Sequence, residues 1–394
     1  MASEVASPWP NLAAARSFLR GLVGYGTAPA ETFSEISLDR LGKWLVKAGL
    51  GPLTYRRYKE TWPELAERLQ PDYYITAIDN RVHFTRLAQI ASLFTAEAIP
   101  FVMLKGAALS QTVYADHLRP MSDLDLWLRV EDMPAAAGVM HSAGFRSTYK
   151  EDRPIALQML SDGELRFASH DRRLVELHLS PFTGWWLKRT ANVDTDALWQ
   201  RIRPCPLPAL DEEEGSDPKN ERGGQLSHVL CAEDTILHLA VHLAVNHQFG
   251  MWGIRSIVDV TMVMQQAKID WQSLVQRAYE WRLATVLWTV LDLQEQLIGG
   301  QDLGPVLRAL QPRRWKARLL ARFIDPPGLL AAQDLRRSQT RFILLLLLTD
   351  RASDAARLIL RTLWPERLWL EARYGEHDAS YGRHLWNVLR HRTV

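Results

Sequence analysis

Residues 101–128, FVMLKGAALSQTVYADHLRPMSDLDLWL, decide the fold that we predict for this chain. The short apolar run from Ile99 to Leu104 predicts a buried strand, and Lys105-Gly106 follows it as a turn that opens a helix. After a loop that contains Arg119, residues DLDLWLRV (123–130) alternate between polar and apolar, as a half-buried strand does. Strand, turn, helix and strand in this order indicate an α/β or α+β unit.

The residues that follow extend this unit. Asp132 is suited to cap a helix over 133–143. The stretch ELRFASHDRRLVELHLS (164–180) predicts a hairpin with Asp171-Arg172 at its turn. We therefore predict an α+β fold whose small mixed sheet is flanked by helical regions on both sides.

Helical spacing of apolar residues governs the rest of the chain. Residues 11–95 are expected to form helices, with Pro52, Pro63 and Pro71 in the connections between them. Further helices are predicted over 233–247, 254–266, 271–298, 303–310, 315–323 and 331–348. The predicted division is a helical region (1–95), a core (96–202), a loop or linker (203–227) and a helical domain (228–394).

Composition limits the compartment and the partners. The net charge is only +2, from 47 basic and 45 acidic residues, which gives no reason to expect nucleic acid or an anionic membrane as partner. Two cysteines cannot form a disulfide framework. The longest apolar run, Phe342–Leu348, has seven residues, whereas a membrane span needs roughly 20. We predict a cytoplasmic protein without a membrane span.

Carboxylates on the predicted strands suggest a metal site. Side chains alternate along a strand, so Asp123 and Asp125 share a face, and in VELHL (175–179) Glu176 and His178 do the same. Such carboxylates can hold Mg²⁺, which prefers oxygen ligands. The alternatives are a solvated strand edge for the aspartates, a surface carboxylate for Glu176 and a hydrogen-bonded structural histidine for His178.

The turn at Lys105-Gly106 adds a candidate phosphate site. A glycine lets a phosphate approach the backbone, the start of a helix offers free N–H donors, and Lys105 contributes a positive charge. An ordinary turn glycine and an exposed lysine are the alternatives.

These motifs resemble a bacterial family of uncharacterised nucleotidyltransferases within the DNA polymerase β-like superfamily. The resemblance rests on residues 101–128, VELHL, EDTILHLAVHLAVNH (233–247) and SIVDV (256–260), and on LWPERLWLEARYG (363–375) near the end of the chain. It implies that Gly106 is the turn glycine, that Asp123 and Asp125 are the metal pair and that Glu176 is the third carboxylate. Arg119 and Ser122 match the polar run before the pair.

The chain departs from the pattern of this superfamily at two places. Its turn is Lys-Gly-Ala, so Ala107 supplies no hydroxyl to a phosphate, and Lys105 or Ser110 would have to compensate. The third carboxylate is Glu176, where many relatives carry Asp.

The role of a histidine-rich segment can be interpreted in more than one way. His238 and His242 are four residues apart, but Leu239 stands where a metalloprotease carries Glu. A non-catalytic zinc site would need a third ligand such as Asp259. The resemblance favours another role, in which His242 lines the cleft facing the carboxylates together with Arg255 and Asp259.

Together these features predict an enzyme that uses Mg²⁺ (or Mn²⁺) to transfer a nucleotidyl group from an NTP such as ATP. The acceptor, a peptide, glycan or small molecule, would be deprotonated near Asp125 or Glu176. One alternative is a degenerate nucleotidyltransferase fold that acts as a binding module. Another is transfer of a sugar-phosphate type of group by the same site.

Overall fold

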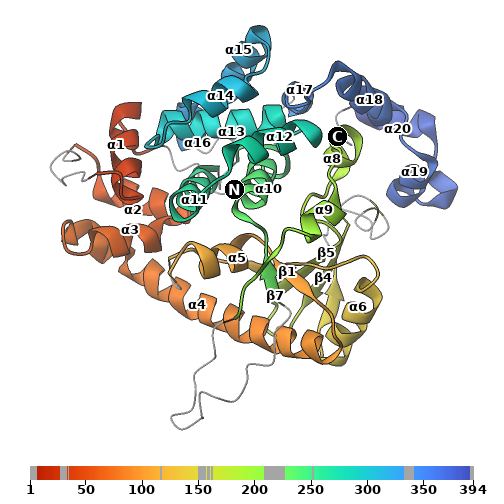
Figure 1. Cartoon of the computed structure of the whole chain (residues 1–394), viewed down its shortest axis with the longest axis horizontal. Helices are drawn as coiled ribbons and strands as arrows, with labels where there is room; N and C mark the ends of the chain where they lie inside the picture. Colours follow the sequence, from red (N-terminus) through yellow and green to blue (C-terminus); the bar gives the residue numbers. More distant parts are fainter. Residues whose placement is uncertain are drawn as a thin grey trace. The chain divides into compact units, whose positions relative to one another are not determined.

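The computed structural model describes residues 7–26, 33, 35–115, 118–149, 157, 160, 163–207, 227–250, 253–331 and 341–390. Helices dominate the described residues, and one mixed sheet of seven strands accompanies them (Figure 1). The predicted α+β class is confirmed. Contacts divide the chain into two compact units, one of Met1–Tyr73, Gly184–Asp194 and Ala232–Val394 and one of Tyr74–Thr183 and Thr195–Cys231.

The first unit consists of helices. Several begin at side-chain caps: Asn11 accepts from the backbone of α1, Ser37 from that of α2 and Asp270 from that of α12. Its helices are α1 (Leu12–Leu22), α2 (Leu38–Lys47), α3 (Gly51–Tyr58), the start of α4 (Pro63–Ala96), α8 (Trp185–Thr190), α10 (Ala232–Val241), α11 (Gly253–Gln266), α12 (Trp271–Glu280), α13 (Ala284–Leu297), α14 (Gly304–Leu310), α15 (Arg314–Phe323), α16 (Pro326–Leu330), α17 (Arg341–Leu347), α18 (Ala352–Leu363), α19 (Arg367–Tyr374) and α20 (Tyr381–Leu389).

Helix α4 corrects one prediction. Pro52 and Pro63 stand at helix starts, but Pro71 lies inside α4 rather than in a connection. A proline leaves the carbonyl four residues earlier without its helical partner. That carbonyl belongs to Glu67, which is exposed like Pro71, so water can satisfy it. The buried residue Leu69 meanwhile keeps this part of the helix packed.

A second correction concerns residues 271–298, which form two helices instead of one. The chain breaks between α12 and α13, where Arg282 adopts a φ of 60°. Its guanidinium donates to Asp354 at 2.9 Å, and the Asp350 carboxylate accepts from the backbone N–H groups of Ala284 (2.9 Å) and Thr285 (2.7 Å). Distant acidic residues therefore decide this break, and no glycine or proline marks it.

Other predicted boundaries differ less from those of the structure. Residues 233–247 split into α10 and a π-helix, η3 (His242–Asn246). The predicted loop at 203–227 carries strands at its two ends, β6 (Arg203–Pro204) and β7 (Ser227–Val229). Residues 208–226 of that loop, and 332–340 of the helix predicted over 331–348, lie outside the described residues.

The sheet belongs to the second unit. Its strands are β1 (Phe101–Met103), β2 (Asp123–Trp127), β3 (Arg146–Thr148), β4 (Glu164–Ala168), β5 (Leu174–His178), β6 and β7, in the order β3-β4-β5-β2-β1-β7-β6. β4 and β5 form the predicted hairpin, and β2 runs parallel to β5. A parallel pair needs a crossover connection, which α6 (Met133–Ser142), β3 and β4 supply.

One face of this sheet carries the core of the unit. Phe94 of α4 and Met140 of α6 pack with Leu126 of β2 and Leu177 of β5, all fully buried. Figure 1 shows α4 and α6 beside the strands. Because side chains alternate along a strand, the apolar residues on this face direct the polar residues of β2 and β5 to the other.

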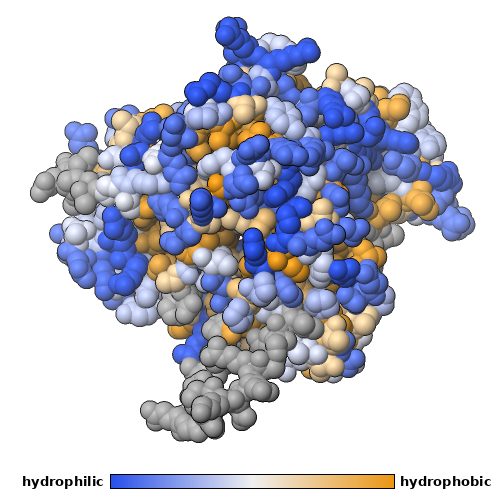
Figure 2. Space-filling model, viewed as in Figure 1, coloured by the Kyte–Doolittle hydropathy of each residue, from blue (hydrophilic) through white to orange (hydrophobic). Residues whose placement is uncertain are grey.

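Hydropathy bears on the predicted absence of a membrane span. On the face seen in Figure 2, hydrophilic residues cover most of the coloured surface and hydrophobic ones are scattered between them. Among the described residues, no helix is both long and apolar enough to cross a bilayer. The cytoplasmic location stays a prediction.

Candidate metal centre

The candidate site forms on the sheet face opposite the core. Leu124 and Leu126 of β2 are fully buried against α4 and α6, which turns Asp125 to the other face. The same alternation in β5 turns Glu176 and His178 to that face. In the parallel pairing of β2 with β5, Asp125 lies opposite Glu176.

Three of these side chains converge. Asp125, Glu176 and His178 each place one ligand atom within 4.8 Å of the other two. The His178 Nε2 atom lies 2.8 Å from Asp125 Oδ1 and 3.7 Å from Glu176 Oε2. All three residues are buried, with at most 7% of their surface exposed. Two carboxylates and an imidazole are donors that a divalent ion accepts, so this set fits a metal.

Asp123 stands slightly apart from this cluster. It begins β2, shares the polar face with Asp125 and is less buried than Asp125. The Ser122 hydroxyl donates to Asp123 Oδ1 at 3.1 Å. The structure thus joins His178, rather than Asp123, most closely to the predicted ligands Asp125 and Glu176. Asp123 as a metal ligand stays a prediction.

Two cations flank the carboxylates. The Lys105 ammonium lies 2.7 Å from Asp125 Oδ1, and the Arg166 Nε atom lies 2.8 Å from Glu176 Oε1. Lys105 sits at the start of α5 (Lys105–Thr112), directly after β1, with a φ of 46°. This left-handed conformation is uncommon for a residue with a side chain. Across the sheet the charges therefore follow the order Arg166, Glu176, Asp125, Lys105.

Sequence reasoning missed Arg166, although a signal was present. Glu164 and Arg166 alternate with the core residues Leu165 and Phe167. This alternation places Arg166 on the polar face of the hairpin together with Glu176. Counting outward from the predicted Asp171-Arg172 turn would pair Arg166 with Leu177, whereas the observed register is centred on Asp171 and pairs Arg166 with Glu176.

The charged residues of the site shift one another's pKa values. Burial by itself would raise the pKa of Asp125, but Lys105 and the hydrogen bond from His178 outweigh it and lower that pKa. Burial raises the pKa of Glu176 and of Asp123, and the charge of Asp125 adds to both effects. Burial opposes the charge of Lys105, yet the three carboxylates hold its pKa above the ordinary value. The ionised forms of Asp123 and Glu176 are therefore disfavoured in the absence of a cation, and a bound cation would offset this cost.

The start of α5 brings the predicted phosphate-binding residues together. A Cβ atom at Gly106 would lie 2.9 Å from Arg119 Nη1 and 2.8 Å from Met121 Cγ. The glycine is thus needed for the close approach of these two side chains. Ser110 lies in the second turn of α5, and its buried hydroxyl oxygen has no hydrogen-bond partner within the described part of the chain.

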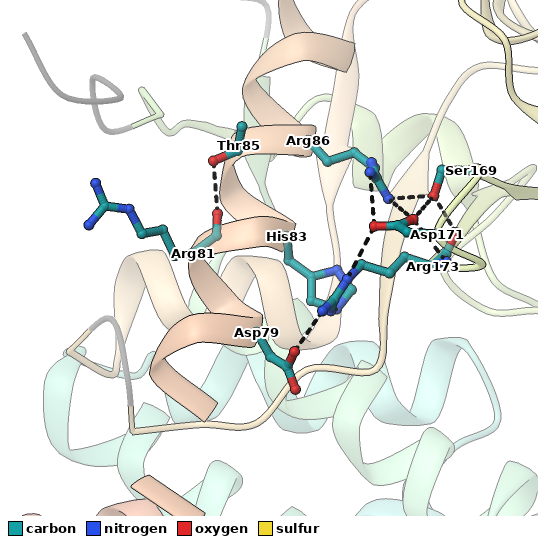
Figure 3. A network of polar contacts seen from close by, with 8 residues as sticks. All are labelled: Asp79, Arg81, His83, Thr85, Arg86, Ser169, Asp171 and Arg173. Atoms are coloured by element: carbon teal, nitrogen blue, oxygen red, sulfur yellow. Dashed lines mark hydrogen bonds and ion pairs between the residues drawn. The ribbon is translucent and has the colours of Figure 1, made fainter. Parts of the chain in front are cut away.

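A polar network ties the β4–β5 hairpin to helix α4 (Figure 3). The Arg86 guanidinium donates to both carboxylate oxygens of Asp171 at 2.9 and 3.3 Å. Arg173 donates to Asp79 at 2.6 Å and contacts His83 Nε2 at 3.2 Å. Burial lowers the pKa of His83 to about 4, with the charge of Arg173 adding to the effect, so this imidazole is neutral at pH 7.

The network has a consequence for the site. Asp171 and Arg173 stand at the turn between β4 and β5, which carry Arg166 and Glu176. Helix α4 also holds the loop that precedes β2, because Asn80 donates to the Arg119 carbonyl at 3.0 Å. One helix thereby fixes two of the segments that supply the site.

The histidine-rich segment lies in the other compact unit. The ring centroids of His238 and His242 are 6.2 Å apart, and those of His242 and His247 are 4.3 Å apart. Within the described residues, Asp125, Glu176 and His178 are the only group of three that meets the spacing for a metal. A zinc site at His238, His242 and Asp259 is therefore not formed. The role of His242 in a cleft facing the carboxylates stays a prediction.

Comparison with known proteins agrees with the motifs. A sequence model of the uncharacterised nucleotidyltransferase family matches residues 34–299, which is more than half of the chain. Neither the curated proteins nor the solved structures contain a match. The matched range includes the Lys105-Gly106 turn, both aspartates of β2 and Glu176. The chain belongs to the uncharacterised nucleotidyltransferase family.

Proposed function

We propose that this chain is a metal-dependent nucleotidyltransferase that moves a nucleotidyl group from an NTP to an acceptor hydroxyl. The observation that carries the proposal is the buried cluster of Asp125, Glu176 and His178, with Asp123 beside it. Clustered carboxylates are costly unless a cation compensates them. Membership of a nucleotidyltransferase family supports the same chemistry.

The residues divide into metal and phosphate groups. Asp125 and Glu176 would hold a divalent ion such as Mg²⁺ or Mn²⁺, with Asp123 and His178 next to them. When bound, such an ion neutralises the charge of the triphosphate and of the displaced pyrophosphate. Asp125 suits this role best, because its lowered pKa keeps it ionised.

Lys105, Arg119 and the start of α5 are suited to the triphosphate. The first N–H groups of a helix have no partner within the helix and point toward an anion. Arg119 lies over Gly106 at this helix start. Lys105 contacts Asp125 and can shift from that carboxylate toward a phosphate oxygen without leaving the site. Ser110 on α5 and Ser122 beside Asp123 are further candidate phosphate ligands through their hydroxyl groups.

The pKa directions separate the candidate proton acceptors. A lowered pKa makes Asp125 a weak base. Glu176 has a raised pKa but is paired with Arg166. Asp123 combines a raised pKa with partial exposure. Lys105 and His178 contact Asp125, and Arg166 contacts Glu176, whereas the partly exposed Asp123 accepts from the neutral hydroxyl of Ser122. On these contacts we assign the proton of the acceptor hydroxyl to Asp123, in place of the Asp125 or Glu176 expected from sequence. The deprotonated oxygen would attack the α-phosphorus, and pyrophosphate would leave.

Calorimetry with a slowly hydrolysed NTP analogue tests this function. We expect binding to the full chain in the presence of Mg²⁺ or Mn²⁺, and weak or no binding in EDTA. Asp125→Asn should abolish the metal dependence, whereas Glu131→Gln, a substitution at an exposed position after β2, should leave it unchanged. Absence of metal-dependent nucleotide binding in the wild-type protein would refute the proposal.

Product analysis addresses the two alternative functions. Incubation with NTP and NDP-sugar panels, followed by mass spectrometry of added peptides and glycans, reports which group is transferred. A mass increase by a nucleoside monophosphate supports nucleotidyl transfer, and an increase by a sugar phosphate supports the related chemistry. Metal-dependent nucleotide binding without any transferred group or released pyrophosphate favours a binding module.

A further inference from the structure

We propose that His178 is a ligand of the bound ion, together with Asp125 and Glu176, and that the site therefore prefers a first-row transition-metal ion such as Mn²⁺ to Mg²⁺. This inference rests on the proposed function and changes one part of it. The ligands expected from sequence are Asp123, Asp125 and Glu176, an all-carboxylate set. The geometry adds an imidazole to this set, because His178 lies within 4.8 Å of both Asp125 and Glu176.

The distances between the ligand atoms suit a shared ion. Metal–ligand distances of about 2.1 Å place neighbouring ligand atoms of an octahedral ion about 3 Å apart. His178 Nε2 lies 2.8 Å from Asp125 Oδ1 and 3.7 Å from Glu176 Oε2. Small side-chain movements would bring all three atoms to one ion.

Burial and strand pairing hold His178 in this position. Only 5% of the residue is exposed. Its backbone carbonyl accepts from Leu128 N–H at 3.0 Å, and the residue lies opposite Trp127 in the β2–β5 pair. The imidazole is thus held inside the sheet and is largely shielded from solvent. An ion at this place would replace the proton that Nε2 shares with Asp125.

Each of the two carboxylates has an oxygen atom that its flanking cation does not contact. Arg166 contacts Glu176 through Oε1, while Oε2 faces His178. Lys105 and His178 contact Asp125 through Oδ1, and within the described part of the chain Oδ2 of Asp125 makes no hydrogen bond. Each carboxylate can therefore keep its flanking cation and still offer an oxygen atom.

The donor set determines which ion is favoured. Mg²⁺ binds oxygen ligands and loses its water reluctantly. Imidazole nitrogen suits transition-metal ions, whose affinity for such sites rises from Mn²⁺ onward along the first row. A site with two carboxylates and one imidazole should therefore bind Mn²⁺ more tightly than Mg²⁺.

Mn²⁺ titration followed by electron paramagnetic resonance measures the preference. The full chain is stripped of metal, and bound Mn²⁺ is read from the loss of the free-ion signal, with Mg²⁺ as competitor. We expect Mn²⁺ to bind roughly tenfold or more tightly than Mg²⁺, and His178→Gln to weaken Mn²⁺ binding by about 10–100-fold. His170→Gln, at an exposed position in the same hairpin, is the matched control and should bind Mn²⁺ like the wild type.

A second readout detects the bound ligand directly. Pulsed electron paramagnetic resonance of bound Mn²⁺ detects a coordinated imidazole nitrogen, and ¹⁵N-histidine labelling of the wild-type protein identifies it as histidine. A histidine coupling that His178→Gln removes and His170→Gln retains supports the assignment. Mn²⁺ that is bound without a histidine coupling overturns the assignment and leaves the proposed function intact. Binding of neither ion overturns both.

Discussion

Lys105→Met is the substitution whose effect follows most directly from the site. It removes the cation that lies 2.7 Å from Asp125 Oδ1, in a pair whose side chains are 18% and 2% exposed. Removing one partner of a buried ion pair costs about 3–5 kcal/mol, because the other charge stays buried and uncompensated. His178 still contacts the same oxygen atom. We therefore expect a loss at the lower end of this range: the free energy of unfolding of Lys105→Met should be about 3 kcal/mol below that of the wild type.

Urea denaturation in EDTA, with the slope of the transition compared between variants, is the assay. Lys43→Met is the matched control, because it breaks a lysine–aspartate pair of similar length, 2.8 Å, whose side chains are 66% and 59% exposed. Such an exposed helical pair contributes only about 0.3–0.5 kcal/mol. If Lys105→Met loses no more stability than Lys43→Met, Lys105 does not compensate Asp125 and the charge order that we describe is wrong.

A double-mutant cycle sharpens the test. Asp125→Asn removes the charge that Lys105 compensates, so the double variant should be more stable than the sum of the two single effects predicts. We expect an interaction energy of roughly 1–3 kcal/mol. Additive losses would show that the two residues act independently.

Three further predictions concern other parts of the chain. Burial raises the pKa of Asp72 from 3.8 to about 6, so the native state loses stability as the pH rises from about 4 through 6. Asp72→Asn should therefore raise Tm at pH 8 in calorimetry and leave it unchanged at pH 3.5. Because Asp72 is partly exposed, the gain in free energy of unfolding at pH 8 should be about 1–2 kcal/mol, below the roughly 3 kcal/mol that the full shift would give. Equal Tm values at pH 8 contradict this. Gly106→Ala should cost about 1–3 kcal/mol in urea denaturation, because two side chains must move, whereas Gly138→Ala, in open space on α6, should gain about 0.5–1 kcal/mol. Asp171→Asn removes charged hydrogen bonds to Arg86 and should cost about 1–2 kcal/mol, with faster hydrogen exchange in β4 and β5; unchanged exchange there would show that the network does not hold the hairpin.

The polar face of the sheet could be predicted because it depends on local pattern. Alternation in residues 123–128 and 174–179 fixes which side chains share a face, whatever the neighbouring strands are. Two of the predicted carboxylates, Asp125 and Glu176, therefore lie together as expected. The closeness of His178 depends on the register between β2 and β5, which the sequence does not state.

Contacts across strands were harder to predict. Arg166 reaches Glu176 only because the hairpin turn sets their register. The contacts of Gly106 were also not apparent from its motif, since the missing Cβ admits Arg119 and Met121 from a loop that follows α5. In both cases the deciding partner lies outside the motif itself.

The predicted helix boundaries were wrong where distant residues or solvent determine the actual ones. Pro71 remains inside α4 because water can satisfy the carbonyl that it frees. The break before α13 depends on Asp350 and Asp354, which lie more than 60 residues later in the chain. Neither effect can be predicted from the helix propensities of the residues at the boundary.

Anomalous diffraction from crystals soaked with Mn²⁺ and a slowly hydrolysed NTP analogue tests the central claim most directly. The account predicts an anomalous peak within about 2.5 Å of carboxylate oxygens of both Asp125 and Glu176, with the triphosphate beside Lys105 and Arg119. A bound analogue with no peak at these carboxylates, or a peak that lies elsewhere, would contradict it.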